Sequence, residues 1–139
     1  MTRISIRGIL IAIPFMLVLD TIGGILLLTI FAGDQLPDGL NADQVHTAIL
    51  AVTQSPGYLM GSLLFGSATT IFGAYLAARI ARTYPYFNAA AFGLVAMLIG
   101  VIMENDAPFW YNAIAYTSTL PVALFGGHLA KKWLSNKIN

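Results

Sequence analysis

The fold is decided by the stretch from Gly8 to Ala32, which reads GILIAIPFMLVLDTIGGILLLTIFA. These 25 residues contain one charged side chain, that of Asp20, and are otherwise mostly leucine, isoleucine and other apolar residues. A helix of about 20 mostly apolar residues is long enough to cross the hydrocarbon core of a bilayer. Arg3 and Arg7 precede the stretch, as in a signal peptide, but the apolar run is too long for one. We therefore expect a retained transmembrane helix.

The composition of the whole chain also indicates a membrane protein. Of 139 residues, 58% are hydrophobic and only 9% are charged, whereas soluble domains carry about 25% charged residues. A formal net charge of +1 gives no reason to expect a nucleic-acid partner. The chain contains no nucleophile elbow, zinc motif, phosphate loop or dinucleotide fingerprint. The sequence therefore gives no motif for an enzyme.

The sequence also predicts neither a cofactor nor a metal site. The absence of cysteine excludes disulfides, thiol catalysis and cysteine-ligated metals. His46 and His128 are expected on opposite sides of the membrane, where they cannot share a ligand. The acidic residues Asp34, Asp38 and Asp43 do not have the spacing of an EF-hand.

Three further stretches extend the pattern to four transmembrane helices. We expect spans at about 8–32, 57–80, 87–104 and 108–130, with one sizeable outer loop at 33–56. Within that loop, Asn41 and Gln44 have the spacing of a capping box, which predicts a short amphipathic helix. The expected fold is a single all-α transmembrane domain over residues 1–139, an up-down four-helix bundle.

Charged residues divide between the two sides of this expected bundle. All seven basic residues fall on one side, and these are Arg3, Arg7, Arg79, Arg82, Lys131, Lys132 and Lys137. Five of the six acidic residues fall on the other, and these are Asp34, Asp38, Asp43, Glu104 and Asp106. Because basic residues stay on the cytoplasmic side, both termini are expected there. Arg79, Arg82, Lys131 and Lys132 are expected to contact lipid phosphates.

Asp20 is the most informative single residue. It is thirteenth of the 25 residues in its span, close to the expected midplane, where an aspartate costs about 2.5–3.5 kcal/mol. It should therefore face the protein interior. Matching depths across the spans predicts a shared polar layer with Ser67, Thr69, Thr70, Thr117, Ser118 and Thr119. Two interpretations remain open, a relay or ligand site and a hydrogen-bonded clasp that fixes helix register.

Small residues recur at helical spacing in the second and third spans. In lipid, such residues let helix backbones approach closely. The pattern predicts packing inside one bundle, a homo-oligomer or a contact in a larger membrane complex, and these remain open. The residues predicted to pack are Gly57, Gly61, Gly66, Gly73, Ala89, Gly93 and Gly100.

The ends of the second and fourth spans resemble each other. The first reads FGAYLAAR at 72–79 and the second reads FGGHLAKK at 125–132, an offset of 53 residues. This similarity suggests two parallel helical hairpins related by duplication. The alternative is that phenylalanine–glycine and leucine–alanine pairs are common in membrane helices.

The second hairpin contains the run FGAYLAARIA at 72–81, followed by Pro85 and by NAAAFG at 88–93. Leu19 and Asp20 are followed by Gly23 and Gly24, and LFGG occurs at 124–127. With these residues, the chain resembles a family of uncharacterised small prokaryotic proteins with four transmembrane helices. The resemblance implies a multi-pass protein of the inner (cytoplasmic) membrane and carries no activity. The motifs of small multidrug transporters and of small fluoride channels are absent.

Two functional expectations follow. The first is a non-enzymatic helix bundle that acts as a structural or accessory subunit, or that binds a small ligand. The alternative is a small transporter or channel that uses Asp20 for proton or cation coupling, because intramembrane acids commonly serve such functions. The lipid bilayer is the one partner that the composition itself predicts.

Overall fold

The chain forms five helices and no strand within the residues that the structure, a computed structural model, describes: 4–33, 39, 41–103 and 106–136. The helices are α1 (Ile6–Ala32), α2 (Ala42–Thr53), α3 (Pro56–Ala81), α4 (Pro85–Ile102) and α5 (Phe109–Asn136). The predicted all-helical fold is confirmed. Three helices, α1, α3 and α4, are long and apolar enough to cross a membrane. The 28-residue α5 is more polar and is not among them.

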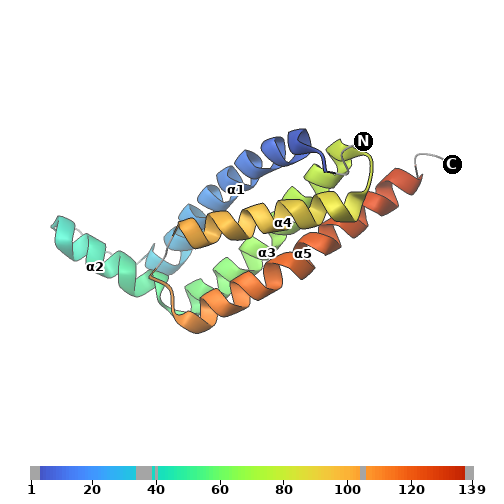
Figure 1. Ribbon diagram of the computed structural model, residues 1–139. Helices are drawn as coiled ribbons and strands as arrows, with labels where there is room; N and C mark the ends of the chain where they lie inside the picture. The colour runs from blue at the N-terminus through green and yellow to red at the C-terminus, as the bar shows by residue number, and fades with distance from the viewer. Residues whose placement is uncertain (1–3, 34–38, 40, 104–105, 137–139) are drawn as a thin grey trace.

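The four long helices pack side by side, and α2 continues beyond one end of them (Figure 1). Helix α3 is the central element, because it packs extensively against each of α1, α4 and α5. Both described termini and the α3–α4 turn lie at one end, which we call the terminal end (Figure 1). Helix α2 and the α4–α5 connection lie at the opposite end, the α2 end (Figure 1).

Short polar side chains determine where three of the helices begin. The Ser5 hydroxyl accepts a hydrogen bond from the Gly8 N–H, and the Ser55 hydroxyl accepts one from the Tyr58 N–H. The predicted capping box is confirmed, since Asn41 and Gln44 exchange side chain–backbone hydrogen bonds of 2.9 and 3.0 Å. Each cap satisfies an N–H that has no partner within its helix. Helix α2 buries only Val52 and extends beyond the other helices (Figure 1).

Small residues close the terminal end. Its buried core contains Ala12, Met16, Ala74, Ala77, Ala78, Ala89, Phe92, Ala123 and Ala130. A Cβ added to Gly8 would lie 2.7 Å from the Ala77 carbonyl oxygen. A Cβ added to Gly126 would collide with the Ile71 carbonyl oxygen and lie 3.0 Å from the Tyr75 nitrogen. Backbones therefore touch at these points, and there is no room for larger side chains.

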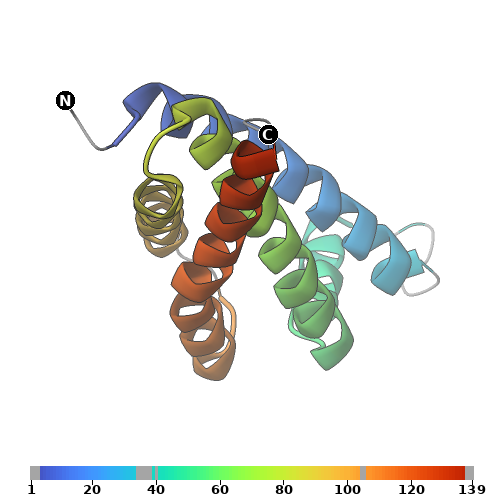
Figure 2. The same ribbon diagram turned by 90° about the vertical axis from the view of Figure 1, so that its right-hand side faces the viewer.

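The four long helices pack less closely toward the α2 end than at the terminal end. Helices α3 and α4 contact each other extensively, whereas the contact between α1 and α4 is small. Figure 2 shows α1 inclined to α3 and α5 rather than parallel to them. If the α1–α3 and α4–α5 hairpins were related by an ideal two-fold axis, α1 would pack against α5 as extensively as α3 packs against α4. The described residues form no comparable contact between α1 and α5. The four long helices consequently leave a space between them toward the α2 end.

Candidate functional site: a cavity beside Asp20

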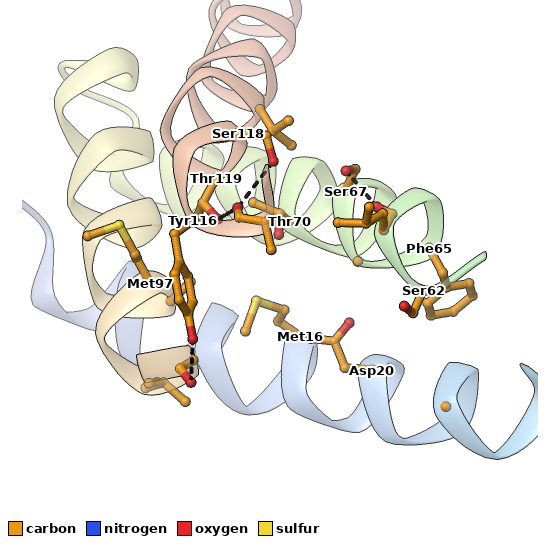
Figure 3. Close-up of a pocket in the computed structure, with 18 of the residues that line it drawn as sticks. Met16, Asp20, Ser62, Phe65, Ser67, Thr70, Met97, Tyr116, Ser118 and Thr119 are labelled. Atoms are coloured by element: carbon orange, nitrogen blue, oxygen red, sulfur yellow. Dashed lines mark hydrogen bonds between the residues drawn. The ribbon is translucent and has the colours of Figure 1, made fainter. Parts of the chain in front are cut away.

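A cavity of about 470 Å³ lies among α1, α3, α4 and α5 (Figure 3). Its lining residues fall within 16–27 of α1, 58–70 of α3, 96–102 of α4 with Met103 just after it, and 111–122 of α5. Because successive helices run in opposite directions, these ranges all belong to the half of the molecule toward the α2 end. The volume is in the range of about 300–1,000 Å³ that is typical of small-molecule sites.

Asp20 lies at the cavity wall on α1 and is half-buried. The Thr69 hydroxyl of α3 donates a hydrogen bond of 2.5 Å to Oδ1 of Asp20. The same hydroxyl lies 3.0 Å from the Gly66 carbonyl oxygen, a second acceptor within its own helix. Figure 3 shows the carboxyl group directed from α1 into the space in front of α3. The described residues that line the cavity include no lysine, arginine or histidine that could pair with it.

Four more residues of the predicted polar layer line the cavity, namely Ser67, Thr70, Ser118 and Thr119. Ser67 donates to the Leu63 carbonyl, and Ser118 and Thr119 both donate to the Ala115 carbonyl. Such bonds to the preceding turn satisfy a hydroxyl inside its own helix. The Thr70 hydroxyl has no hydrogen-bond partner in the described part of the chain. Among these four hydroxyls, that of Thr70 is therefore the most available to a ligand in the cavity.

Thr117 does not belong to this layer, which corrects the sequence-based prediction. Its side chain is exposed on α5, and its hydroxyl donates to the Ala113 and Ile114 carbonyls. Successive residues of a helix are separated by about 100° of rotation, so three consecutive residues do not share one face. Ser118 and Thr119 line the cavity as the predicted layer requires, whereas Thr117 points in another direction around α5.

A second polar group lies nearer the α2 end of the cavity. The hydroxyl groups of Ser62 on α3 and Tyr111 on α5 are 2.9 Å apart and hydrogen-bonded. Tyr58 and Asn112 line the same region. Ser62 precedes Thr69 by seven residues, which corresponds to about 10 Å along a helix. This pair could not be predicted from the sequence, because spacing within one helix does not show which side chains of two different helices meet.

The predicted small-residue contacts are mostly made within this chain. A Cβ added to Gly57 or Gly61 would meet Phe31 or Leu27 of α1 at 2.7 or 3.1 Å. Gly73 faces the Phe92 ring of α4, and Gly93 faces the Ala123 Cβ of α5.

Gly100 lies next to the Tyr116 ring, and the buried Ala89 lies next to Gly127. The prediction for Gly66 is wrong, because no atom lies within 4 Å of an added Cβ. Gly66 borders the cavity instead. Of the small residues on α3, Gly73 thus lies at a helix contact, whereas Gly66 lies beside open space.

Aromatic rings accompany the cationic side chains of the terminal end. The Arg79 guanidinium lies 4.1 Å from the centre of the Trp133 ring and 5.9 Å from that of Tyr75. The Lys131 ammonium lies 5.4 Å from the Tyr86 ring. Arg82 and Lys132 are exposed. Contact of these four basic residues with lipid phosphates stays a prediction.

Asp34, Asp38 and Glu104 lie outside the described residues. Among the residues that are described, no group of three histidine, aspartate or glutamate side chains could hold a metal ion. No family model, curated protein or solved structure matches the chain. The chemistry of the cavity is therefore the basis on which a function is assigned.

Proposed function

We propose that this chain is an integral membrane protein that binds a small amphiphilic molecule in the cavity beside Asp20. In this proposal, α1, α3, α4 and α5 all cross the bilayer, and α2 lies outside. The terminal end, with both termini and the α3–α4 turn, faces the cytoplasm. The membrane is the cell inner membrane, in keeping with the positively charged terminal end and with the family that the sequence resembles.

Exposed apolar side chains support membrane insertion. Large hydrophobic residues are exposed along α1 and α4, including Leu10, Val18, Ile22, Ile25, Ile30, Leu94, Leu98 and Ile102. Rows of this extent are unusual on a water-facing monomer but suit contact with lipid tails. Together with the hydropathy of α1, α3 and α4, they favour a lipid environment.

The inclusion of α5 as a fourth span rests on its packing and length. It contacts both α3 and α4, and its 28 residues span about 42 Å at 1.5 Å per residue. Ser118, Thr119 and Tyr116 face the cavity rather than lipid. A helix whose polar side chains face an internal cavity can cross a bilayer with a lower overall hydropathy.

Ligand binding is favoured by one observation, which is that the Asp20 carboxyl faces a cavity of about 470 Å³ with no basic partner in its described lining. A structural clasp would need only Thr69 and no adjoining cavity. The close backbone contacts of Gly8 and Gly126 with α3 at the terminal end favour a cavity closed on that side over a pore. These features favour a non-enzymatic binding protein. Oligomerisation is not required, because most of the small residues pack within the chain.

A small transporter with proton or cation coupling through Asp20 is the second candidate. The observation that favours it is an acid near the middle of α1, half-buried and facing a cavity. Transport would require the contacts of Gly8 and Gly126 to open in a second state. Solute-dependent proton uptake by reconstituted vesicles, abolished by Asp20→Asn, would favour this candidate.

Single-cysteine labelling tests the proposed binding site, since the chain has no cysteine of its own. Ser118→Cys should react with a small charged thiol reagent added from the α2 side, and octanol should slow the reaction by occupying the cavity. Thr117→Cys is the matched control, because it lies at the same depth but is exposed outside the cavity. Equal reaction at both positions, or no protection by any amphiphile, would contradict the proposal.

A further inference from the structure

We infer that the ligand is a protonated amine with an apolar body, whose ammonium group pairs with Asp20 and whose body lies along the cavity toward Ser62 and Tyr111. This inference rests on the proposed function and specifies the chemical class of the ligand. It follows from the charge, hydrogen bonding and lining of the cavity.

The charge of the cavity is the first step. Asp20 is the only acidic side chain among the described lining residues, and no basic side chain accompanies it. A buried charge is costly unless an opposite charge and hydrogen bonds accompany it. Thr69 supplies one hydrogen bond to Oδ1, but a hydroxyl group carries no compensating charge. A cationic ligand would supply the missing positive charge.

The hydrogen-bonding groups of the cavity suit an ammonium group. An ammonium has three N–H donors and needs acceptors. The Asp20 carboxylate and the unpartnered Thr70 hydroxyl both border the cavity and can accept. Ser67, Ser118 and Thr119 also have acceptor lone pairs, although each donates its own hydrogen to a helix carbonyl.

The lining argues against a bare metal ion. Calcium takes six to eight oxygen ligands, and magnesium takes six in near-octahedral geometry. The cavity provides a single carboxylate among mainly apolar side chains such as Met16, Leu63, Phe65 and Met97. These side chains suit the hydrocarbon part of an amine and cannot replace the hydration shell of a metal ion.

Aromatic and methionine side chains occupy the rest of the wall. Tyr58, Phe65, Tyr111 and Tyr116 line the cavity, and aromatic faces attract alkylammonium groups. Met16, Met97 and Met103 also line it, and the flexible thioether can adapt to apolar groups of different shapes. The Ser62–Tyr111 pair, about 10 Å from the Asp20 layer by helical rise, suits a polar group at the other end of a ligand.

Protection of Ser118→Cys from the charged thiol reagent tests this inference, with three eight-carbon compounds compared at equal bilayer concentration. Octylammonium should protect at a concentration about tenfold lower than octanol, a difference of about 1.4 kcal/mol. Octanoate should protect least, because its charge is repelled by Asp20. Adding Asp20→Asn, which keeps an acceptor for Thr69, should make octylammonium no better than octanol.

The outcomes separate the two proposals. Equal protection by octylammonium and octanol, or stronger protection by octanoate, would overturn the amine inference and leave the binding proposal standing. No protection by any of the three compounds would overturn both. If Asp20→Asn fails to fold, the comparison of the three compounds with Asp20 intact still decides the charge preference. A preference for octylammonium that survives Asp20→Asn would assign the cation site to other residues and refute the inference.

Discussion

The side-chain oxygen of Asn88 accepts a hydrogen bond of 2.7 Å from the backbone N–H of Ser5, although 83 residues separate them. Asn88 is fully buried, and its amide nitrogen donates to the carbonyls of Thr83 and Tyr84 at 2.9 and 3.1 Å. One side chain thus joins the start of α1 to the turn between α3 and α4. It stabilises the terminal end, where glycine and alanine contacts close the structure.

Replacing Asn88 by alanine should destabilise the protein by about 1–3 kcal/mol, because the Ser5 N–H and the Thr83 carbonyl lose the Asn88 side chain as a hydrogen-bond partner. The Tyr84 carbonyl keeps the bond that it accepts from the backbone N–H of residue 88. The measurement is the free energy of unfolding in detergent micelles. Asn136→Ala is the control, since Asn136 is exposed at the end of α5 and should leave stability unchanged. An Asn88→Ala variant as stable as the parent would mean that water replaces all three hydrogen bonds.

Gly126→Ala should lower stability by about 1–3 kcal/mol, as expected for overpacking against atoms that cannot move away. The added methyl group would meet the backbone of Ile71 and Tyr75. Gly66→Ala is the matched control, with open space around its Cβ position. It should be neutral or stabilise by about 0.5–1 kcal/mol, the cost of glycine relative to alanine in a helix. Thermal unfolding in the same detergent compares the two, and equal melting would refute the close contact between α3 and α5.

Asp20→Leu should change stability by less than about 1 kcal/mol, because the Thr69 hydroxyl can still donate to the Gly66 carbonyl. Asp20→Asn should fold as well as the parent, since it keeps an acceptor for Thr69. Both variants should lose preferential binding of octylammonium. Chemical unfolding and amine binding are measured on the same samples. A large loss of stability in Asp20→Leu, with amine binding retained in Asp20→Asn, would identify Asp20 as a structural clasp.

Thr47→Cys on α2 should react with a membrane-impermeant thiol reagent added outside intact cells. Thr83→Cys in the α3–α4 turn and Ser135→Cys on α5 should react only after the membrane is made permeable. All three native side chains are exposed, so their reactivity reports the side of the membrane. External reaction of Ser135→Cys alone would mean that α5 does not end in the cytoplasm, and internal reaction of Thr47→Cys would reverse the orientation.

The sequence predicted the local structure well because helix formation depends on short-range properties. Runs of apolar residues gave the long helices, and α3 and α4 begin at Pro56 and Pro85, close to the expected starts of the second and third spans. The capping box at Asn41 and Gln44 gave the start of α2. Comparing positions along the expected helices also placed Thr69 in one layer with Asp20, to which it donates a hydrogen bond. This comparison works because the rise per residue is the same in every α-helix.

The sequence alone determined that the chain is helical, that its long helices are apolar and that an acid lies halfway along the first of them. Tertiary structure decided which face each helix directs at its neighbours and how closely the helices pack. Neither property follows from the spacing of residues within one helix. Thr117 is exposed while Ser118 borders the cavity, and Gly66 faces open space while Gly73 meets Phe92. These differences depend on the inclination of α1 and on which pairs of helices touch. The closed terminal end and the cavity beside Asp20 therefore depend on how the helices pack, and the rows of small and polar residues do not determine them alone.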